Sequence, residues 1–532
     1  MEDLSIRLSD LPDEILIFIL RKLYDVEVLY SLIGVNKRLN TLAYDSIFTT
    51  HLTLYFLDKF IYPLPDPMLD RFRLQILPKI HHKVKWLNLE STSIERILLA
   101  TNYPNLNGLG LYDIDVEKAL YLFNNDIVFA RINRSQISSL VIDISKDEEH
   151  IAVLKNDVNN IVFSKIFTMF INLQYLSFGP WTNLRPPSLF EMPYPSAISS
   201  NLLELHICGT FFTDLLYLLD GRFNQLHTFH VNIIFFHCTT STIHSREKLP
   251  NLRYFSLHSN TGLHNYDESI VPLLHRMLNL EKLDLQLVVH RNKGFINGND
   301  FKEDIINNMS RLNKFTFNIR LFNYLPNQTN ILSNENIQCK FKDFKSNEII
   351  SCVDYFQEKQ YSYCHFYSYP YRMNYYDNIS NNFPGGLFKN VHRVSLFDER
   401  SFEHEFFIQI QKSFPFMKEL TVINAKPQKN KLYRKSKNDN QYLSIIKYPH
   451  LTELCLLQAH DDYVEQFLLD TDVFMPNNVH LIVYYQAMKR VTENFTRHAT
   501  RVNCAKLASV SLLDTYKFIK PVKDYFPRAD KH

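Results

Sequence analysis

A short apolar phrase, L-x-x-L-x-L with loose substitution, recurs thirteen times along this chain of 532 residues. The copies read VKWLNL, LNGLGL, ISSLVI, LQYLSF, LLELHI, LHTFHV, LRYFSL, LEKLDL, LNKFTF, VHRVSL, MKELTV, LTELCL and VHLIVY, and they begin at Val84, Leu106, Ile137, Leu173, Leu202, Leu226, Leu252, Leu280, Leu312, Val391, Met417, Leu451 and Val479. Most copies follow one another after 22 to 36 residues. A repeat of this length is typical of chains that stack many short units, because one unit alone cannot bury its own leucines.

Each phrase ends in alternating apolar and polar residues, which is the period-two pattern of a half-buried strand. Turn residues often precede the phrase, as in Pro104-Asn105-Leu106. Helix-like stretches, such as 213–219 and 271–278, lie between the phrases. The pattern predicts an α/β fold in which short parallel strands lie along one face and helices lie opposite.

This arrangement resembles an irregular leucine-rich-repeat solenoid over residues 81–515, with a parallel sheet on its concave face. The repetition lapses between Phe317 and Val391, where a tyrosine-rich stretch lies at 361–376. Two interpretations of this insertion, placed around 340–390, stay open. It either grips a ligand with its tyrosines, or it is an atypical repeat whose tyrosines cover the convex side.

If the repeated leucines point inward, the residues between them form an outward row. The residues of this row that we expect to contact a target are Trp86, Tyr175, His206, His230, Tyr254, Lys282 and Asp284, and the same alternation also selects Asn88, Ser256, Thr316, Arg393, Glu419 and Glu453. The mixture of aromatic, polar and charged side chains suits a recognition surface. The alternative is an ordinary solvated face.

The N-terminal residues 8–48 follow a different pattern. Pro12 suits the first position of a helix, and Asp13 and Glu14 then lie in its first turn, near the positive end of the helix dipole. The helix that follows is apolar on nearly every side, through the run ILIFIL and Leu23. A unit of about forty residues rarely builds a core that can cover such a helix. The segment therefore predicts a docking module.

Three short helices over 5–49, which open with Leu-Pro-x-Glu and close with Val-Asn-Lys-Arg-Leu-x-x-Leu, resemble the F-box. Asn36 and Leu39 depart from its commonest pattern, which has Cys and a bulky aromatic residue at these positions. The resemblance implies docking onto the Skp adaptor, and through it onto a cullin, in an SCF-type ubiquitin ligase. It places Leu11, Pro12, Ile15, Leu16, Leu20, Leu23 and Val35 at adaptor-binding positions, and we expect Leu16 to be partly exposed in the free protein.

The two resemblances together imply a non-catalytic substrate receptor that holds a protein target with its repeats. Residues 50–80, which contain four prolines, would be a stiff linker between the two parts. The alternative is a scaffold protein whose N-terminal helices cap the repeats without recruiting a ligase.

Composition and motifs exclude several other classes. The net charge of +2 gives no reason to expect nucleic acid or a membrane surface, and no stretch of about eighteen apolar residues occurs. Seven scattered cysteines without a CxxC pair predict reduced thiols, and hence a cytoplasmic or nuclear protein. Eleven glycines and no GxGxxG or GxxxxGK[ST] argue against nucleotide chemistry. We expect no active site, no metal and no cofactor. The basic stretch 426–437 is interpreted as a solvated loop, with a nuclear-import signal or an acidic-partner patch as the alternative.

Overall fold

The computed structural model describes residues 11–57, 61–144, 155–179, 197–236, 248–291, 303, 305–324, 348–371, 373–429, 444–514 and 520–531. The chain divides into two compact units. The first, unit 1, comprises Met1–Val288 and Asp300–Thr316, and the second, unit 2, comprises Val289–Asn299 and Phe317–His532. The repeated phrases are thus distributed over both units.

Unit 1 begins with four short helices, α1 (Asp13–Leu20), α2 (Asp25–Leu32), α3 (Lys37–Ala43) and α4 (Ser46–Thr49). Side chains fix where two of them begin. The Asn36 side chain accepts a hydrogen bond from the Leu39 N–H (2.8 Å), and the Asp45 side chain accepts one from the Ile47 N–H (2.9 Å). These bonds satisfy donors that the first turn of a helix leaves without an internal partner.

The next segment, 50–80, is folded rather than extended. It forms β1 (His51–Thr53), β2 (Tyr55–Leu57), β3 (Ile61–Pro63), α5 (Asp66–Arg71), the π-helical turn η2 (Phe72–Ile76) and α6 (Leu77–Ile80). Leu57, Tyr62 and Leu74 are exposed, but most of its apolar side chains are buried, including Leu52, Leu54, Leu69, Phe72, Ile76, Leu77 and Ile80. Arg71 donates a hydrogen bond to the Ile33 carbonyl (2.7 Å) and lies over the Tyr30 ring. This segment, which the sequence suggested as a linker, therefore packs against the N-terminal helices.

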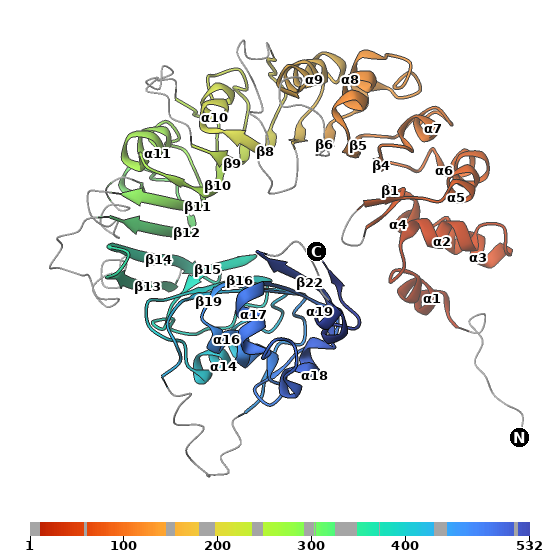
Figure 1. Ribbon diagram of the computed structural model, residues 1–532. Coiled ribbons are helices and arrows are strands. Elements are labelled where there is room, and N and C mark those ends of the chain that lie inside the picture. Colours follow the sequence, from red (N-terminus) through yellow and green to blue (C-terminus); the bar gives the residue numbers. More distant parts are fainter. Residues whose placement is uncertain are drawn as a thin grey trace, which may run out of the picture. The chain divides into compact units, whose positions relative to one another are not determined.

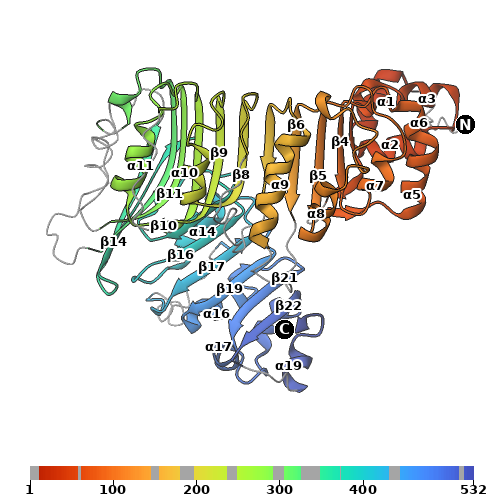
Figure 2. The same cartoon turned by 90° about the horizontal axis from the view of Figure 1, so that it is seen from above.

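A row of strands follows in chain order (Figures 1 and 2): β4 (Trp86–Glu90), β5 (Gly108–Ile114), β6 (Ser139–Ile144), β7 (Tyr175–Phe178), β8 (Glu204–Phe211), β9 (Thr228–Phe235), β10 (Tyr254–Leu263) and β11 (Lys282–Arg291). The pairs from β1–β4 to β9–β10 are parallel. On one side of the row lie α7 (Ile94–Leu98), α8 (Val116–Asn124), α9 (Lys155–Met169), α10 (Phe212–Leu218) and α11 (Tyr266–Leu274). Two 3-10 turns, η3 (Arg134–Gln136) and η4 (Ile306–Asn308), also belong to this unit.

Three groups of strands involve unit 2, and the first includes β12 (Lys314–Asn323), whose residues 314–316 still belong to unit 1. Strands β12, β14 (Tyr361–Tyr369) and β13 (Glu348–Phe356) pair antiparallel in that order. A seven-stranded parallel sheet has the order β15 (Tyr375–Ile379), β16 (Arg393–Phe397), β17 (Glu419–Asn424), β19 (Glu453–Ala459), β21 (Val479–Tyr484), β22 (Leu507–Leu513) and β23 (Asp530–Lys531). The short strands β18 (Ile446–Lys447) and β20 (Val473–Phe474) form a separate parallel pair.

The helices of unit 2 are α14 (His404–Ser413), α16 (Asp461–Leu468), α17 (Tyr485–Val491), α18 (Arg501–Cys504) and α19 (Lys520–Tyr525), with a 3-10 turn, η5 (His498–Thr500). Helices α14, α16 and α17 lie on one face of the seven-stranded sheet (Figure 1). One continuous core contains side chains from both layers, for example Leu420 and Val422 of β17 and Phe407 and Ile410 of α14.

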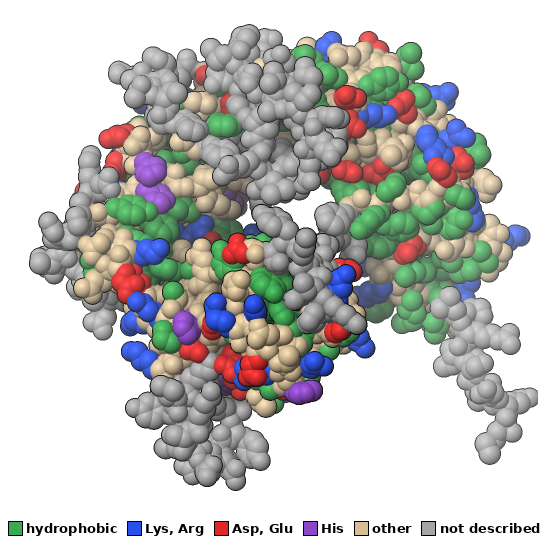
Figure 3. Space-filling model, viewed as in Figure 1, with side chains coloured by type: hydrophobic (Ala, Val, Ile, Leu, Met, Phe, Trp, Pro, Cys, Tyr) green, Lys and Arg blue, Asp and Glu red, His purple; other side chains and the backbone are tan. Residues whose placement is uncertain are grey.

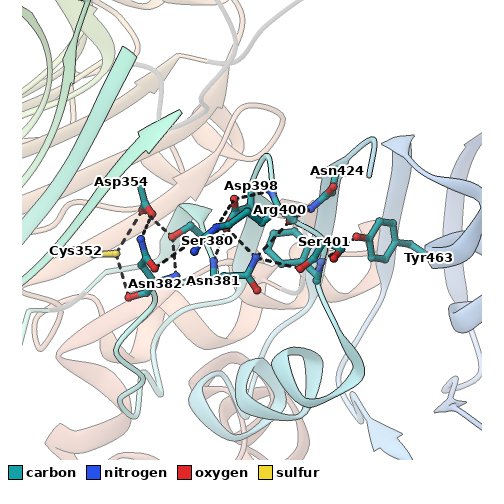
Figure 4. A network of polar contacts seen from close by, with 11 residues as sticks. Cys352, Asp354, Ser380, Asn381, Asn382, Asp398, Arg400, Ser401, Asn424 and Tyr463 are labelled. Carbon is teal, nitrogen blue, oxygen red and sulfur yellow. Dashed lines mark hydrogen bonds and ion pairs between the residues drawn. The ribbon is translucent and has the colours of Figure 1, made fainter. Parts of the chain in front are cut away.

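A buried polar network joins β13 to the C-terminal ends of β15, β16 and β17 (Figure 4). Asp354 accepts hydrogen bonds from the Ser380 hydroxyl and the Asn382 amide, both at 2.7 Å. Asp398 accepts one from the Asn381 N–H (2.8 Å), and Asn424 donates one to the Arg400 carbonyl (2.7 Å). Buried backbone groups that leave a sheet must find other partners. The network supplies them.

All thirteen phrases form strands, and the prediction of an α/β fold with a large, mostly parallel sheet is confirmed. The repeated leucines are buried, as Leu87, Leu89, Leu109 and Leu111 illustrate with 0% exposure. The antiparallel hairpin of β13 and β14 departs from the pattern. It arises where the phrases lapse and the chain between the two strands is a short turn, which permits antiparallel pairing only.

Candidate binding surfaces

The N-terminal helices carry an exposed apolar surface. Five side chains, which we call the docking face, are exposed although they are large and apolar: Ile15 (47%), Phe18 (63%), Ile19 (39%), Leu23 (50%) and Val35 (59%). Figure 3 shows hydrophobic side chains gathered over the region of α1. Scattered exposed leucines are ordinary on a protein surface, whereas three of these five side chains, Ile15, Phe18 and Ile19, lie on one short helix. Such a group is a candidate binding surface.

The predicted adaptor-binding residues fall into two groups. Pro12, Ile15, Leu23 and Val35 are exposed, and Leu11 is half-buried. Leu16 and Leu20 are buried, with 1% and 6% exposure, so the expectation that Leu16 is partly exposed is wrong. The two leucines are four positions apart and share the core side of α1, because residues at i and i+4 lie on one face of a helix.

The sequence prediction omitted two members of the docking face, Phe18 and Ile19. They follow Ile15 at intervals of three and four residues, which is the spacing that identifies one face of a helix. A helix that is apolar all round has no polar stripe to show which side faces solvent. The correct assignment needed the neighbouring elements.

Polar contacts hold α1 in place. Arg38 of α3 forms an ion pair with Asp13 (2.7 Å) and also donates to the Leu11 carbonyl. The Lys22 ammonium lies 5.3 Å from the centre of the Phe18 ring, a cation–π contact at the rim of the docking face. The docking face is therefore presented by a helix that is already fastened to its neighbours.

A second surface follows the strands of unit 1. Tyr175, His206, His230 and Tyr254 lie on adjacent strands in one continuous series of ring contacts, which we call the ring row. Successive ring centres are 5.2, 4.2 and 4.6 Å apart, and the two imidazoles are stacked with an interplanar angle of 24°. His206 and His230 are direct partners in the parallel pairing of β8 with β9. All four side chains are partly exposed.

Acidic side chains flank the ring row. His206 Nε2 lies 2.7 Å from Glu204 Oε1, and His258 Nε2 lies 2.8 Å from Asp284 Oδ2. Asp284 also accepts a hydrogen bond from the Thr316 hydroxyl (2.8 Å). Burial, together with the neighbouring His206, lowers the pKa of His230 from its ordinary value to about 4, so this imidazole is neutral at pH 7.

The structure thus brings together five of the seven predicted target-contacting residues: Tyr175, His206, His230, Tyr254 and, through its carboxylate, Asp284. Lys282 is exposed, whereas Trp86 lies on β4, four strands away from His206. Glu204 and His258 were missed. Each lies two residues from a residue of the predicted row, and side chains at i and i+2 of a strand share a face, so the alternation could have found them.

The Trp86 ring fits on the sheet because its neighbour on β5 is a glycine. A Cβ at Gly108, its direct partner on β5, would lie 2.0 Å from the Trp86 ring, so the indole lies across the glycine. The indole N–H donates to the Asn88 side chain (2.6 Å), and the ring stacks on His51.

The tyrosine-rich segment is a core element. Tyr363, Tyr367 and Tyr376 are 0–3% exposed, and His365 between them is 1% exposed and bonds the Asn318 side chain at 2.7 Å. Burial raises the pKa of the Cys352 and Cys364 thiols, which therefore stay protonated at neutral pH. The centre of the segment accordingly offers no reactive thiolate. Towards its ends Tyr361, Tyr369, Tyr371 and Tyr375 are partly exposed, so both interpretations of the insertion stay open.

Other predicted features are placed only in part. Residues 430–437 of the basic stretch lie outside the described residues, and Lys426 at its start pairs with Glu358. No helix within the described ranges is long and apolar enough to cross a membrane. Comparison with protein-family models and with curated proteins found no match for this chain.

Proposed function

We propose that the chain is the substrate-recognition subunit of an SCF-type ubiquitin ligase, in which an F-box at residues 5–49 binds the Skp adaptor. One observation carries the proposal. The helix that follows Leu11-Pro12 leaves Ile15, Phe18 and Ile19 exposed, and Leu23 just after it is exposed as well. A module that docks through its first helix requires such a surface. A few well-packed side chains at the centre of an interface usually dominate its binding free energy, and truncating one of them costs about 2 kcal/mol or more.

The strands of unit 1 and unit 2 are, in this proposal, an irregular leucine-rich-repeat domain that holds the target protein. The ring row supports this role, since aromatic and imidazole side chains give large contact areas with few rotatable bonds. The receptor performs no chemistry. It raises the rate of ubiquitin transfer by holding the target close to the transfer machinery of the cullin complex.

The test is a titration of the full chain against purified Skp adaptor. Wild-type protein should bind, and Ile15→Ser with Phe18→Ser should weaken binding at least about thirtyfold, since loss of an interface anchor costs about 2 kcal/mol or more. Ile127→Ser is the matched control, because Ile127 is as exposed (67%) but lies between α8 and η3. It should bind as wild type does.

The double substitution removes only exposed side chains, so the melting temperature should not change by more than a few degrees. A wild-type chain that does not bind the adaptor contradicts the ligase proposal. The scaffold alternative then applies, with the N-terminal helices serving to cap the repeats. Equal losses in the double variant and the Ile127 control would also contradict it, because the docking face would not be the site.

A further inference from the structure

Glu204, His206 and His230 form a group whose potential metal-ligating atoms all lie within 4.8 Å of one another. It is the one such group of three among the residues that the structure describes. Two features of the sheet produce it. Glu204 and His206 are two residues apart on β8, so they leave the same face, and His230 is the partner of His206 on β9.

We propose that these three side chains bind a first-row divalent transition metal, with Zn²⁺ as the principal candidate. The inference does not depend on the adaptor-binding proposal. Two imidazole nitrogens and one carboxylate oxygen are a donor set that Zn²⁺, Ni²⁺, Co²⁺ and Cu²⁺ accept, whereas Mg²⁺ and Ca²⁺ prefer oxygen ligands alone.

The three ligand atoms lie within 4.8 Å of one another, so the metal requires a limited rearrangement in which the stacked imidazoles tilt toward one ion. Ligand atoms about 2.0–2.1 Å from a tetrahedral zinc ion are about 3.3 Å from one another. Glu204 Oε1 and His206 Nε2 are already 2.7 Å apart, joined by a hydrogen bond. An ion would replace the shared proton and draw in the His230 ring by a side-chain movement on the order of 1 Å. The side chains of His206 and Glu204 are 25% and 41% exposed, so they have room to adjust.

Neighbouring rings fix the imidazoles from both sides. The ring centres of Tyr175 and His206 are 5.2 Å apart. Those of Tyr254 and His230 are 4.6 Å apart, and these two rings are nearly perpendicular, with an interplanar angle of 79°. These contacts limit the rotamers of both imidazoles, so the loss of side-chain freedom on metal binding is smaller, while the stacked rings must still tilt toward a shared ion. Three protein ligands leave at least one coordination position for water or for a side chain of a bound protein.

The experiment uses the full chain without a histidine tag, stripped with a chelator. Zn²⁺ alone is titrated by calorimetry, and Co²⁺ alone is followed by its visible absorption. Wild type should take up one equivalent of either ion. His230→Gln and Glu204→Gln should each weaken Zn²⁺ binding by at least about tenfold, since each removes one of three ligands.

His460→Asn is the control. His460 pairs with Asp462 (3.3 Å) and accepts a hydrogen bond at the start of α16, a role that Asn can keep while it removes one imidazole. Binding should be unchanged in this variant. Melting curves recorded without metal show whether each variant folds. If a ligand variant does not fold, His206→Asn is titrated in its place. A wild-type chain that takes up no equivalent, or equal binding in wild type and the ligand variants that fold, would overturn the proposal.

Discussion

Gly108 shows how one residue decides the surface of a strand. Gly108→Ala would place a methyl group where the Trp86 ring now lies. The indole would have to move away from residue 108 and would lose its hydrogen bond to Asn88. We expect a loss of about 1–3 kcal/mol in the free energy of unfolding, the usual cost of overpacking. Tryptophan fluorescence of the folded variant should also change. An unchanged spectrum and unchanged stability would show that the indole does not lie across the glycine.

The buried His365 should make the stability of the protein depend on pH. Burial, with Arg320 nearby, holds its pKa well below the ordinary value, so the folded state keeps it neutral while the unfolded chain is protonated below about pH 6.5. The unfolded state then binds more protons, and stability falls as the pH falls. His365→Gln should therefore make the free energy of unfolding less sensitive to pH, by about 1.4 kcal/mol per unit below about pH 6.5.

Urea unfolding at about pH 5 and about pH 7 measures this difference. The exposed His392 provides the control, and His392→Gln should keep the wild-type dependence on pH. If His365→Gln and wild type lose the same stability on acidification, His365 is protonated in the folded protein.

At the scale of the element, one side of α1 is buried in the fold and the opposite side is exposed. Leu16→Ala should lower the free energy of unfolding by about 2–5 kcal/mol, because its side chain is 1% exposed. Phe18→Ala on the opposite side should change it by less than about 0.5 kcal/mol. Denaturant unfolding of the two variants checks the assignment. A larger loss for Phe18→Ala would show that the helix packs the other way round.

The elements also show how far the sequence predicts this fold. Strand positions were predictable, because leucines at fixed intervals alternate with polar residues in every phrase. The orientation of α1 was not predictable, since its apolar residues surround the helix axis and no polar stripe marks the side that faces solvent. The site was partly predictable. His206 and His230 were assigned to one face, but their direct pairing depends on the register of β8 and β9, which sequence spacing does not specify.

At the scale of the whole molecule, the chain has two compact units, each with its own buried side chains. A unit with its own core is expected to unfold cooperatively by itself. We therefore predict two transitions in calorimetry of the full chain. Leu111→Ala of unit 1 should shift only one transition, and Val422→Ala of unit 2 only the other. A single transition that both variants shift equally would contradict this prediction.

The contact of Arg38 with Asp13 and the Leu11 carbonyl has a consequence for the timing of association. In the proposed complex, α1 is already ordered against α3, so the adaptor would meet a folded docking face rather than a helix that has to become ordered during the encounter. Association should then proceed in one kinetic step whose rate is proportional to partner concentration. Arg38→Ala would loosen the helix, slow productive encounters and add a concentration-independent phase, which stopped-flow fluorescence can resolve.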